Sequence, residues 1–127
     1  MQEIYKENIL DHFKHPRNFG PLKGAQTSAR EVNTICGDEV EVQVKIKAGK
    51  ISEIKFQGQG CAISQAAASM LTEEVKGKSI EEVQNLEKGD ILKMLGIPIS
   101  PARLKCALLA LYATKNSLNK LKAKVTC

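Results

Sequence analysis

The segment 40–46 alternates strictly between apolar and polar side chains, and this pattern constrains the fold more than any other feature of the chain. Its apolar positions are Val40, Val42, Val44 and Ile46, and its polar positions are Glu41, Gln43 and Lys45. Because successive side chains of a strand point to opposite faces of a sheet, this alternation predicts a half-buried strand. Such a strand requires a neighbouring strand and a layer that covers its apolar face.

A second strand is expected directly after the first. Ala48-Gly49-Lys50 supplies a turn, and Ile54 and Phe56 resume the alternation on a strand that ends near Gly60. The two strands are therefore predicted to form an antiparallel hairpin. Residues 27–35 alternate more weakly and are predicted to form a third strand.

A helix is predicted before the strands, over residues 3–14. Apolar positions recur there at helical spacing on one face, and Pro16 ends the helix because it lacks an N–H group. The residues expected on this face are Tyr5, Ile9, His12 and Phe13.

Further helices are predicted after the hairpin. They cover the alanine-rich segment 61–76, a short helix over 80–86 that Ser79 and Glu82 open as a capping box, one turn over 90–95, and a long helix over 101–122. The long helix has a core face formed by Leu104, Leu108, Leu111 and Leu118. This order predicts one α+β domain over residues 1–127, with a small antiparallel three-stranded sheet and helices packed on one of its faces.

The composition excludes several classes of function. Nineteen Lys and Arg against fourteen Asp and Glu give a net charge of +5, but the aromatic residues are only two Tyr and three Phe, without Trp. The pattern of a single-strand nucleic-acid binder is therefore missing, and the C-terminal lysines 115, 120, 122 and 124 are predicted to be a solvated helix face. No stretch approaches ~18 apolar residues, and no basic segment precedes an apolar one at the N-terminus. We expect a cytoplasmic protein that binds neither nucleic acid nor membranes.

The cysteines at 36, 61, 106 and 127 are the main candidates for chemistry. In a protein that is not exported, disulfides are disfavoured, which leaves metal binding, thiol chemistry or simple burial. Extending the hairpin register outward places Asp38 opposite Gly60, so Cys36, Asp38 and Cys61 are expected to meet at the open end of the hairpin. Two thiolates and a carboxylate form most of a tetrahedral site for zinc or for the iron of a cluster.

The remaining candidates are weaker. Cys106 lies on a small apolar face of the long helix, beside Leu109 and Ala110, and the pattern leaves open whether it is a buried small hydrophobe or a further ligand. Cys127 is the last residue and is expected to be a bystander thiol. His12 and His15 are expected to serve in packing and surface hydrogen bonding.

Four separated motifs resemble the IscU/SufU/NifU N-terminal scaffold family. They are Tyr5 to Asn18, Cys36-Gly37-Asp38, Gly60 to Ser64 with the helix after it and Lys76-Gly77-Lys78, and Ala102 to Cys106. The resemblance implies an α+β scaffold on which iron and sulfur are assembled into a transient [2Fe–2S] cluster. A pyridoxal-phosphate-dependent cysteine desulfurase would supply the sulfur as a persulfide, and the cluster would pass to apo-proteins.

The resemblance also implies which residues form the site. Cys36, Cys61 and Cys106 would be the ligands of the cluster and the candidate persulfide acceptors, and Asp38 would be the nearby acid that keeps the cluster labile. Lys105 stands where IscU-type members carry a histidine, and a lysine at neutral pH is a poor ligand. The segment 99–103 also differs from the Leu-Pro-Pro-Val-Lys segment that chaperones grip in IscU.

These departures look more like the SufU branch, whose members bind zinc through three cysteines and the aspartate and accept sulfur. The inserted segment that SufU proteins carry between their second and third cysteines is nevertheless missing here. The favoured function is the scaffold, the alternative is a zinc-dependent sulfurtransferase, and a structural zinc module comes third. We expect purified protein to carry zinc, because zinc suits a site of three cysteines and an aspartate and outcompetes ferrous iron.

Overall fold

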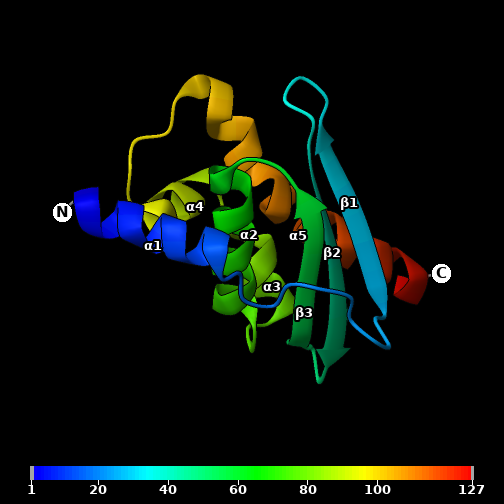
Figure 1. The fold of residues 1–127 in the computed structure, drawn as a ribbon. Helices are drawn as coiled ribbons and strands as arrows, with labels where there is room; N and C mark the ends of the chain where they lie inside the picture. The colour runs from blue at the N-terminus through cyan, green and yellow to red at the C-terminus, as the bar shows by residue number, and fades with distance from the viewer. Residues whose placement is uncertain (1, 127) are drawn as a thin grey trace.

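The computed structural model describes the backbone of residues 2–126 and the side chains of residues 6–121 (Figure 1). Three strands form one antiparallel sheet in the order β1-β2-β3: β1 (Thr27–Asn33), β2 (Asp38–Lys47) and β3 (Lys50–Gln59). The described helices are α1 (Gln2–Lys14), α2 (Ala62–Val75), α3 (Ile80–Gln84), α4 (Lys88–Leu95) and α5 (Pro101–Thr126). None of these helices combines the length and the apolarity that crossing a bilayer requires.

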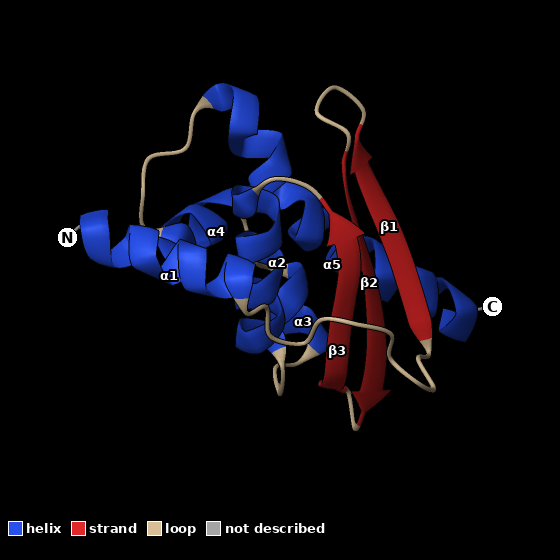
Figure 2. Ribbon diagram, in the orientation of Figure 1, coloured by secondary structure: helices blue, strands red, loops and turns tan. Residues whose placement is uncertain are grey.

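The helices cover one face of the sheet, which confirms the predicted α+β fold (Figure 2). Val40, Val42 and Val44 of β2 point into this layer and are fully buried, while the alternate residues of β2 stay partly exposed. Helix α5 packs against β1 and β2 on one side and against α2 on the other. For this reason both its leucine face and the face of Cys106 are buried.

The predicted hairpin register is confirmed over most of its length. Val42 faces Phe56 and Val44 faces Ile54. A one-residue shift occurs only between Lys45 and Ile46, next to the turn that the hairpin closes through positive-φ residues. The register toward the opposite, open end of the hairpin is therefore undisturbed, and that end also receives the β1–β2 loop and the β3–α2 connection (Figure 1).

The segment after α1 covers the free edge of the sheet. The Gly20 N–H donates to the Phe56 carbonyl and the Phe56 N–H donates to the Asn18 carbonyl, both at 2.9 Å. The Phe19 ring packs edge-on against the Phe56 ring, with 5.3 Å between centroids. These contacts pair backbone groups that would otherwise offer an open strand edge to another chain.

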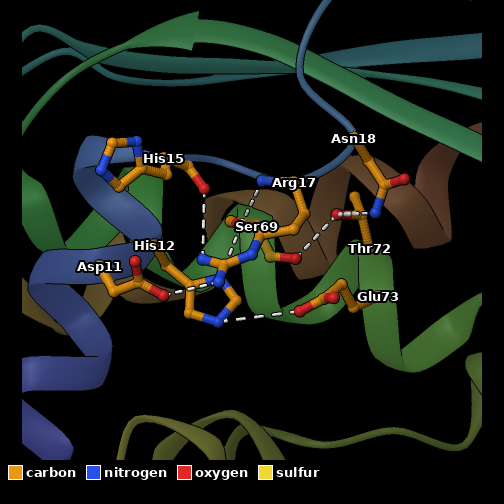
Figure 3. A network of polar contacts seen from close by, with 8 residues as sticks. All are labelled: Asp11, His12, His15, Arg17, Asn18, Ser69, Thr72 and Glu73. Atoms are coloured by element: carbon orange, nitrogen blue, oxygen red, sulfur yellow. Dashed lines mark hydrogen bonds and ion pairs between the residues drawn. The ribbon is translucent and has the colours of Figure 1, made fainter.

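A polar network, here called the α1–α2 network, holds α1 and the segment after it against α2 (Figure 3). Ser69 Oγ lies 2.7 Å from His12 Nδ1 and accepts from the Arg17 N–H at 2.8 Å. The Asn18 amide donates to the Thr72 hydroxyl at 3.2 Å. Side chains from α1 and its following segment therefore find their polar partners on α2, and His12 serves the packing role expected of it.

Some predicted details of the helices are wrong. Phe13 is expected on the buried face of α1 but is 41% exposed, because α1 packs mainly on α2 and Ile9 is its buried apolar residue among the described side chains. The capping box of Ser79 and Glu82 is present, but α3 ends at Gln84. Tyr5 and the lysines at 122 and 124 lie outside the residues whose side chains are described.

Candidate functional site

Three side chains from distant parts of the chain meet at the open end of the hairpin. Asp38 is the first residue of β2, Cys61 is the N-cap of α2, and Cys106 lies in the second turn of α5. One potential ligand atom of each lies within 4.8 Å of the other two, and no other such group is found among the described residues. Asp38 is 5% exposed and Cys106 is 2% exposed. We call this group the cysteine site.

Gly60 leaves the space that the cysteine site occupies. A Cβ atom at this position would lie 2.7 Å from Asp38 Cγ and 2.6 Å from Ser64 Oγ, closer than real Cβ contacts come. Any larger residue would force the Asp38 carboxylate or the Ser64 hydroxyl to move. A glycine between β3 and α2 is therefore required for these groups to converge.

The carboxylate of Asp38 is incompletely satisfied. Its Oδ2 atom is buried and has no hydrogen-bond partner within the described structure. A buried charged oxygen without a partner costs stability, and a bound ion, ligand or ordered water would remove that cost. Two sulfurs and a carboxylate are donors that suit Zn²⁺ or an iron of a cluster, so the residues present fit a metal centre.

Proton binding at the site differs between the acid and the buried thiol. Burial opposes ionisation of Asp38, but hydrogen bonding from Cys106, Cys61 and Ser64 together outweighs it, and the pKa of Asp38 is lowered. Burial, together with the neighbouring Asp38, raises the pKa of Cys106 to about 12. The metal-free site thus holds a carboxylate beside a neutral thiol at pH 7. A metal ion that binds Cys106 must displace the proton of that thiol.

Cys36 is not part of the close group: of the three side chains expected to meet at the open end of the hairpin, Asp38 and Cys61 do so, and Cys36 lies outside the set of atoms within 4.8 Å of one another. Backbone pairing ends at Asn33 and Asp38, and the intervening loop turns outward through Gly37, which has a φ of 76°. Cys36 is exposed and its neighbour Ile35 is 85% exposed. Burial and Asp38 are the main causes that raise the pKa of Cys106, and the Cys36 side chain raises it further. Cys36 therefore lies near the cysteine site.

Asn33 was missed by the reasoning from sequence. Its Nδ2 donates to Cys106 Sγ at 3.3 Å, and its Oδ1 accepts from the Ile35 N–H at 3.1 Å. An asparagine whose side chain accepts from the N–H two residues later is a common start of a turn. That local signal was available, but the contact with Cys106 spans 73 residues and was not.

The remaining predicted candidates lie elsewhere. His15 is exposed, and Lys105 is exposed and does not join the group of ligand atoms. Cys127 lies outside the described residues. The roles of Cys36, Asp38, Cys61 and Cys106 as ligands or sulfur acceptors stay predictions.

Two cysteines and an aspartate meet where the open end of the hairpin, the start of α2 and the second turn of α5 come together. This arrangement points to the class of cysteine-based metal- or cluster-binding domains. Residues 4–127 match the family model described as the NifU-like N terminal domain. The chain therefore belongs to this family, whose relatives include iron–sulfur cluster assembly scaffold proteins.

Named relatives span almost the whole chain. The zinc-dependent sulfurtransferase SufU of Bacillus subtilis (strain 168) is 34% identical, with 94% of this chain and 92% of the relative covered. The iron–sulfur cluster assembly enzyme IscU of Drosophila melanogaster is 40% identical, with 95% and 80% covered. A crystal structure of the putative SUF-system scaffold of Fervidobacterium islandicum AW-1 is 30% identical, covers 92% of this chain and 98% of its own, and superimposes with a TM-score of 0.77.

Proposed function

We propose that this protein is a scaffold that receives sulfur from a cysteine desulfurase, binds iron, builds a [2Fe–2S] cluster and transfers it to apo-proteins. The observation that carries the proposal is the cysteine site itself, with its unpartnered buried Asp38 oxygen and an exposed thiol at its mouth. Membership of the NifU-like family and relatives named as scaffold proteins support it.

Sulfur would enter at Cys36. Of the three described cysteines it is the exposed one, whereas Cys61 is half-buried and Cys106 is buried. Its thiolate would attack the terminal sulfur of the desulfurase persulfide. A new S–S bond forms on Cys36 while the S–S bond on the desulfurase breaks, and the desulfurase cysteine leaves as a thiolate. This step needs no outside oxidant or reductant.

Cluster formation then requires electrons. Reducing two persulfide sulfurs to sulfide takes four electrons, and two ferrous ions supply two of them on becoming ferric. An electron-donor protein or a dithiol must supply the other two. The cluster is the cargo of the protein, and its four ligands would be Cys36, Asp38, Cys61 and Cys106. Because a carboxylate replaces one thiolate and Cys36 lies on an exposed loop, the cluster would be released readily to an acceptor.

Anaerobic reconstitution tests this proposal. The protein would be incubated with its cognate desulfurase, cysteine, ferrous iron and a dithiol, and visible absorption and metal content would be measured. The expected result is the absorption of a [2Fe–2S] cluster, with iron and sulfide in equal amounts. A stable zinc content and no cluster under these conditions would rule out the scaffold.

The alternative is a zinc-dependent sulfurtransferase. The similarity to SufU of Bacillus subtilis and the two sulfurs and one carboxylate of the site favour it, since Zn²⁺ would be held by Asp38, Cys61 and Cys106 while Cys36 accepts sulfur. Both functions predict a persulfide on Cys36. Mass measurement of each Cys→Ser variant after turnover with the desulfurase identifies the acceptor, and only the scaffold goes on to form a cluster.

A purely structural metal is the third function to exclude. If the metal only held the fold, Asp38→Ala would lower the melting temperature of the metal-loaded protein as the metal is lost. If the site handles a cluster, the same variant should keep its melting temperature and change the lifetime of the cluster. Differential scanning calorimetry and the decay of visible absorption distinguish the two.

A further inference from the structure

We propose that Asn33 is a positioning residue of the cysteine site, whose side-chain amide couples the loop of Cys36 to the sulfur of Cys106 and keeps its N–H on that sulfur when a metal ion is bound. This inference rests on the proposed function, because it assigns a role within the same site. Asn33 itself is not expected to bind the metal or accept sulfur.

The contacts of Asn33 join two elements that are far apart in the sequence. Its Nδ2 donates to Cys106 Sγ of α5 at 3.3 Å, while its Oδ1 accepts from the Ile35 N–H at 3.1 Å. Its backbone carbonyl accepts from the Gly37 N–H at 2.7 Å. Asn33 is 6% exposed, so these bonds form away from water. Asn33 is therefore hydrogen-bonded to two residues of the loop that carries Cys36, and also to the buried sulfur of Cys106.

An amide is the group that this position requires. The carbonyl oxygen and the NH₂ group of asparagine accept and donate at the same time, whereas a carboxylate only accepts and a serine hydroxyl is too short to reach both partners. A hydrogen bond to an ionised sulfur is about twice as strong as one to a neutral group. The bond from Asn33 should therefore strengthen when Cys106 loses its proton to a metal ion.

A stronger hydrogen bond from Asn33 to the metal-bound sulfur of Cys106 has two measurable consequences. Removing an outer partner of a metal ligand typically lowers metal affinity about 10–100-fold. Hydrogen bonds to ligating sulfurs also withdraw electron density from them and tune the electronic properties of the centre. Loss of the Asn33 donor should thus weaken binding and lower the energy of sulfur-to-metal charge transfer.

The first experiment uses Co²⁺ alone as the probe, because its thiolate charge-transfer bands are visible. Asn33→Ser keeps an oxygen that can accept from the Ile35 N–H but loses the donor to Cys106. We expect its charge-transfer band at longer wavelength than in the wild type and its Co²⁺ dissociation constant, measured by chelator competition, to be about 10–100-fold larger.

Thr27→Val is the matched control. Thr27 lies at the other end of β1, is buried, and donates to the Ser117 carbonyl of α5 at 2.7 Å. The variant therefore removes one buried β1–α5 hydrogen bond without touching a sulfur. It should lose stability but keep the wild-type band position and Co²⁺ affinity, which separates positioning of the sulfur from general loosening of the fold.

A second measurement needs no variant and so does not depend on whether Asn33→Ser folds. In wild-type protein loaded with ¹¹³Cd²⁺, nuclear magnetic resonance should detect a scalar coupling between the metal and the side-chain amide proton of Asn33, transmitted through Cys106 Sγ. Absence of this coupling, or an Asn33→Ser band and affinity equal to those of the wild type, would overturn the inference alone. A wild type without thiolate–Co²⁺ bands would overturn the proposed metal site and this inference with it.

Discussion

The α1–α2 network and the cysteine site are two polar clusters, one on α2 and one at its N-terminal end, yet they differ in how well their polar atoms are satisfied. In the network, Ser69 meets both His12 and Arg17, and Asn18 meets Thr72 (Figure 3). In the cysteine site, Asp38 Oδ2 is buried and has no hydrogen-bond partner among the described residues. A satisfied network stabilises the fold, whereas an unsatisfied one destabilises it until a ligand arrives.

The comparison indicates that one polar cluster serves stability and the other serves metal binding. The polar groups of the α1–α2 network have hydrogen-bond partners within the protein, so changes there should alter stability and leave metal binding intact. The carboxylate of the cysteine site has an oxygen without a hydrogen-bond partner among the described residues, so changes there should alter metal binding and leave the metal-free fold intact. The following predictions test this division in order of expected size.

The largest effect is expected for Cys61→Ala on metal affinity. A structural zinc site of four ligands is worth about 10–16 kcal/mol, so losing one ligand should weaken Zn²⁺ binding on the order of 100-fold. The Cys61 side chain makes no capping hydrogen bond to α2, and its thiol interacts with Asp38, so the metal-free variant should lose about 1 kcal/mol or less in urea unfolding. Chelator competition measures the affinity. Unchanged Zn²⁺ binding would remove Cys61 from the site.

Gly60→Ala should have the next largest effect. Its Cβ would lie 2.7 Å from Asp38 Cγ, so the carboxylate has to move and Zn²⁺ affinity should fall about 10–100-fold. Gly89→Ala is the matched control, because a Cβ at this helical position meets nothing within 4 Å. The control should bind Zn²⁺ like the wild type and be at least as stable, given the higher helix propensity of alanine. Equal affinities in the two variants would contradict the described geometry.

Ser69→Ala should lower stability without changing metal binding. The variant leaves the Arg17 N–H and His12 Nδ1 without their partner in a buried place, which should cost about 2 kcal/mol in the free energy of unfolding. Asp38→Asn is the counterpart at the other cluster, and it should leave the metal-free stability within about 1 kcal/mol of the wild type, since Oδ2 has no hydrogen bond to lose. Urea unfolding of metal-free protein checks both. A larger loss in Asp38→Asn than in Ser69→Ala would reverse the comparison.

The smallest effect concerns pH and His12. Burial, assisted by the nearby Arg17, lowers the pKa of His12 below its ordinary value of 6.5. As the pH falls below 6.5, the unfolded chain therefore takes up a proton on this residue before the folded protein does. The stability contributed by neutral His12 is complete above that pH and declines as the pH falls toward the folded-state pKa. Urea unfolding between pH 7 and 5.5 should show this decline in the wild type and a shallower one in His12→Gln. Identical slopes would show that His12 does not titrate abnormally.

Much of the fold was predictable because the deciding signals are local. The alternation of β2 and β3 defines the buried face and the register, and that register alone brings Asp38 near the start of α2 and hence near Cys61. The capping box at Ser79 likewise depends only on residues three apart. The exposure of Phe13 was not predictable in this way, because it depends on how narrow a surface α2 offers to α1.

The sequence by itself determined which side chains could serve as metal ligands and which face of the hairpin is buried, since these depend on residue type and on a period of two. Only the tertiary structure decided that α5 packs against β1, β2 and α2 with the thiol of Cys106 close to Asp38, and that the Asn33 amide donates to this sulfur. The physical reason is the distance along the chain over which each feature is determined. Alternation and capping depend on residues close in sequence, whereas the position of a helix some forty residues after Cys61 results from the packing of the whole core.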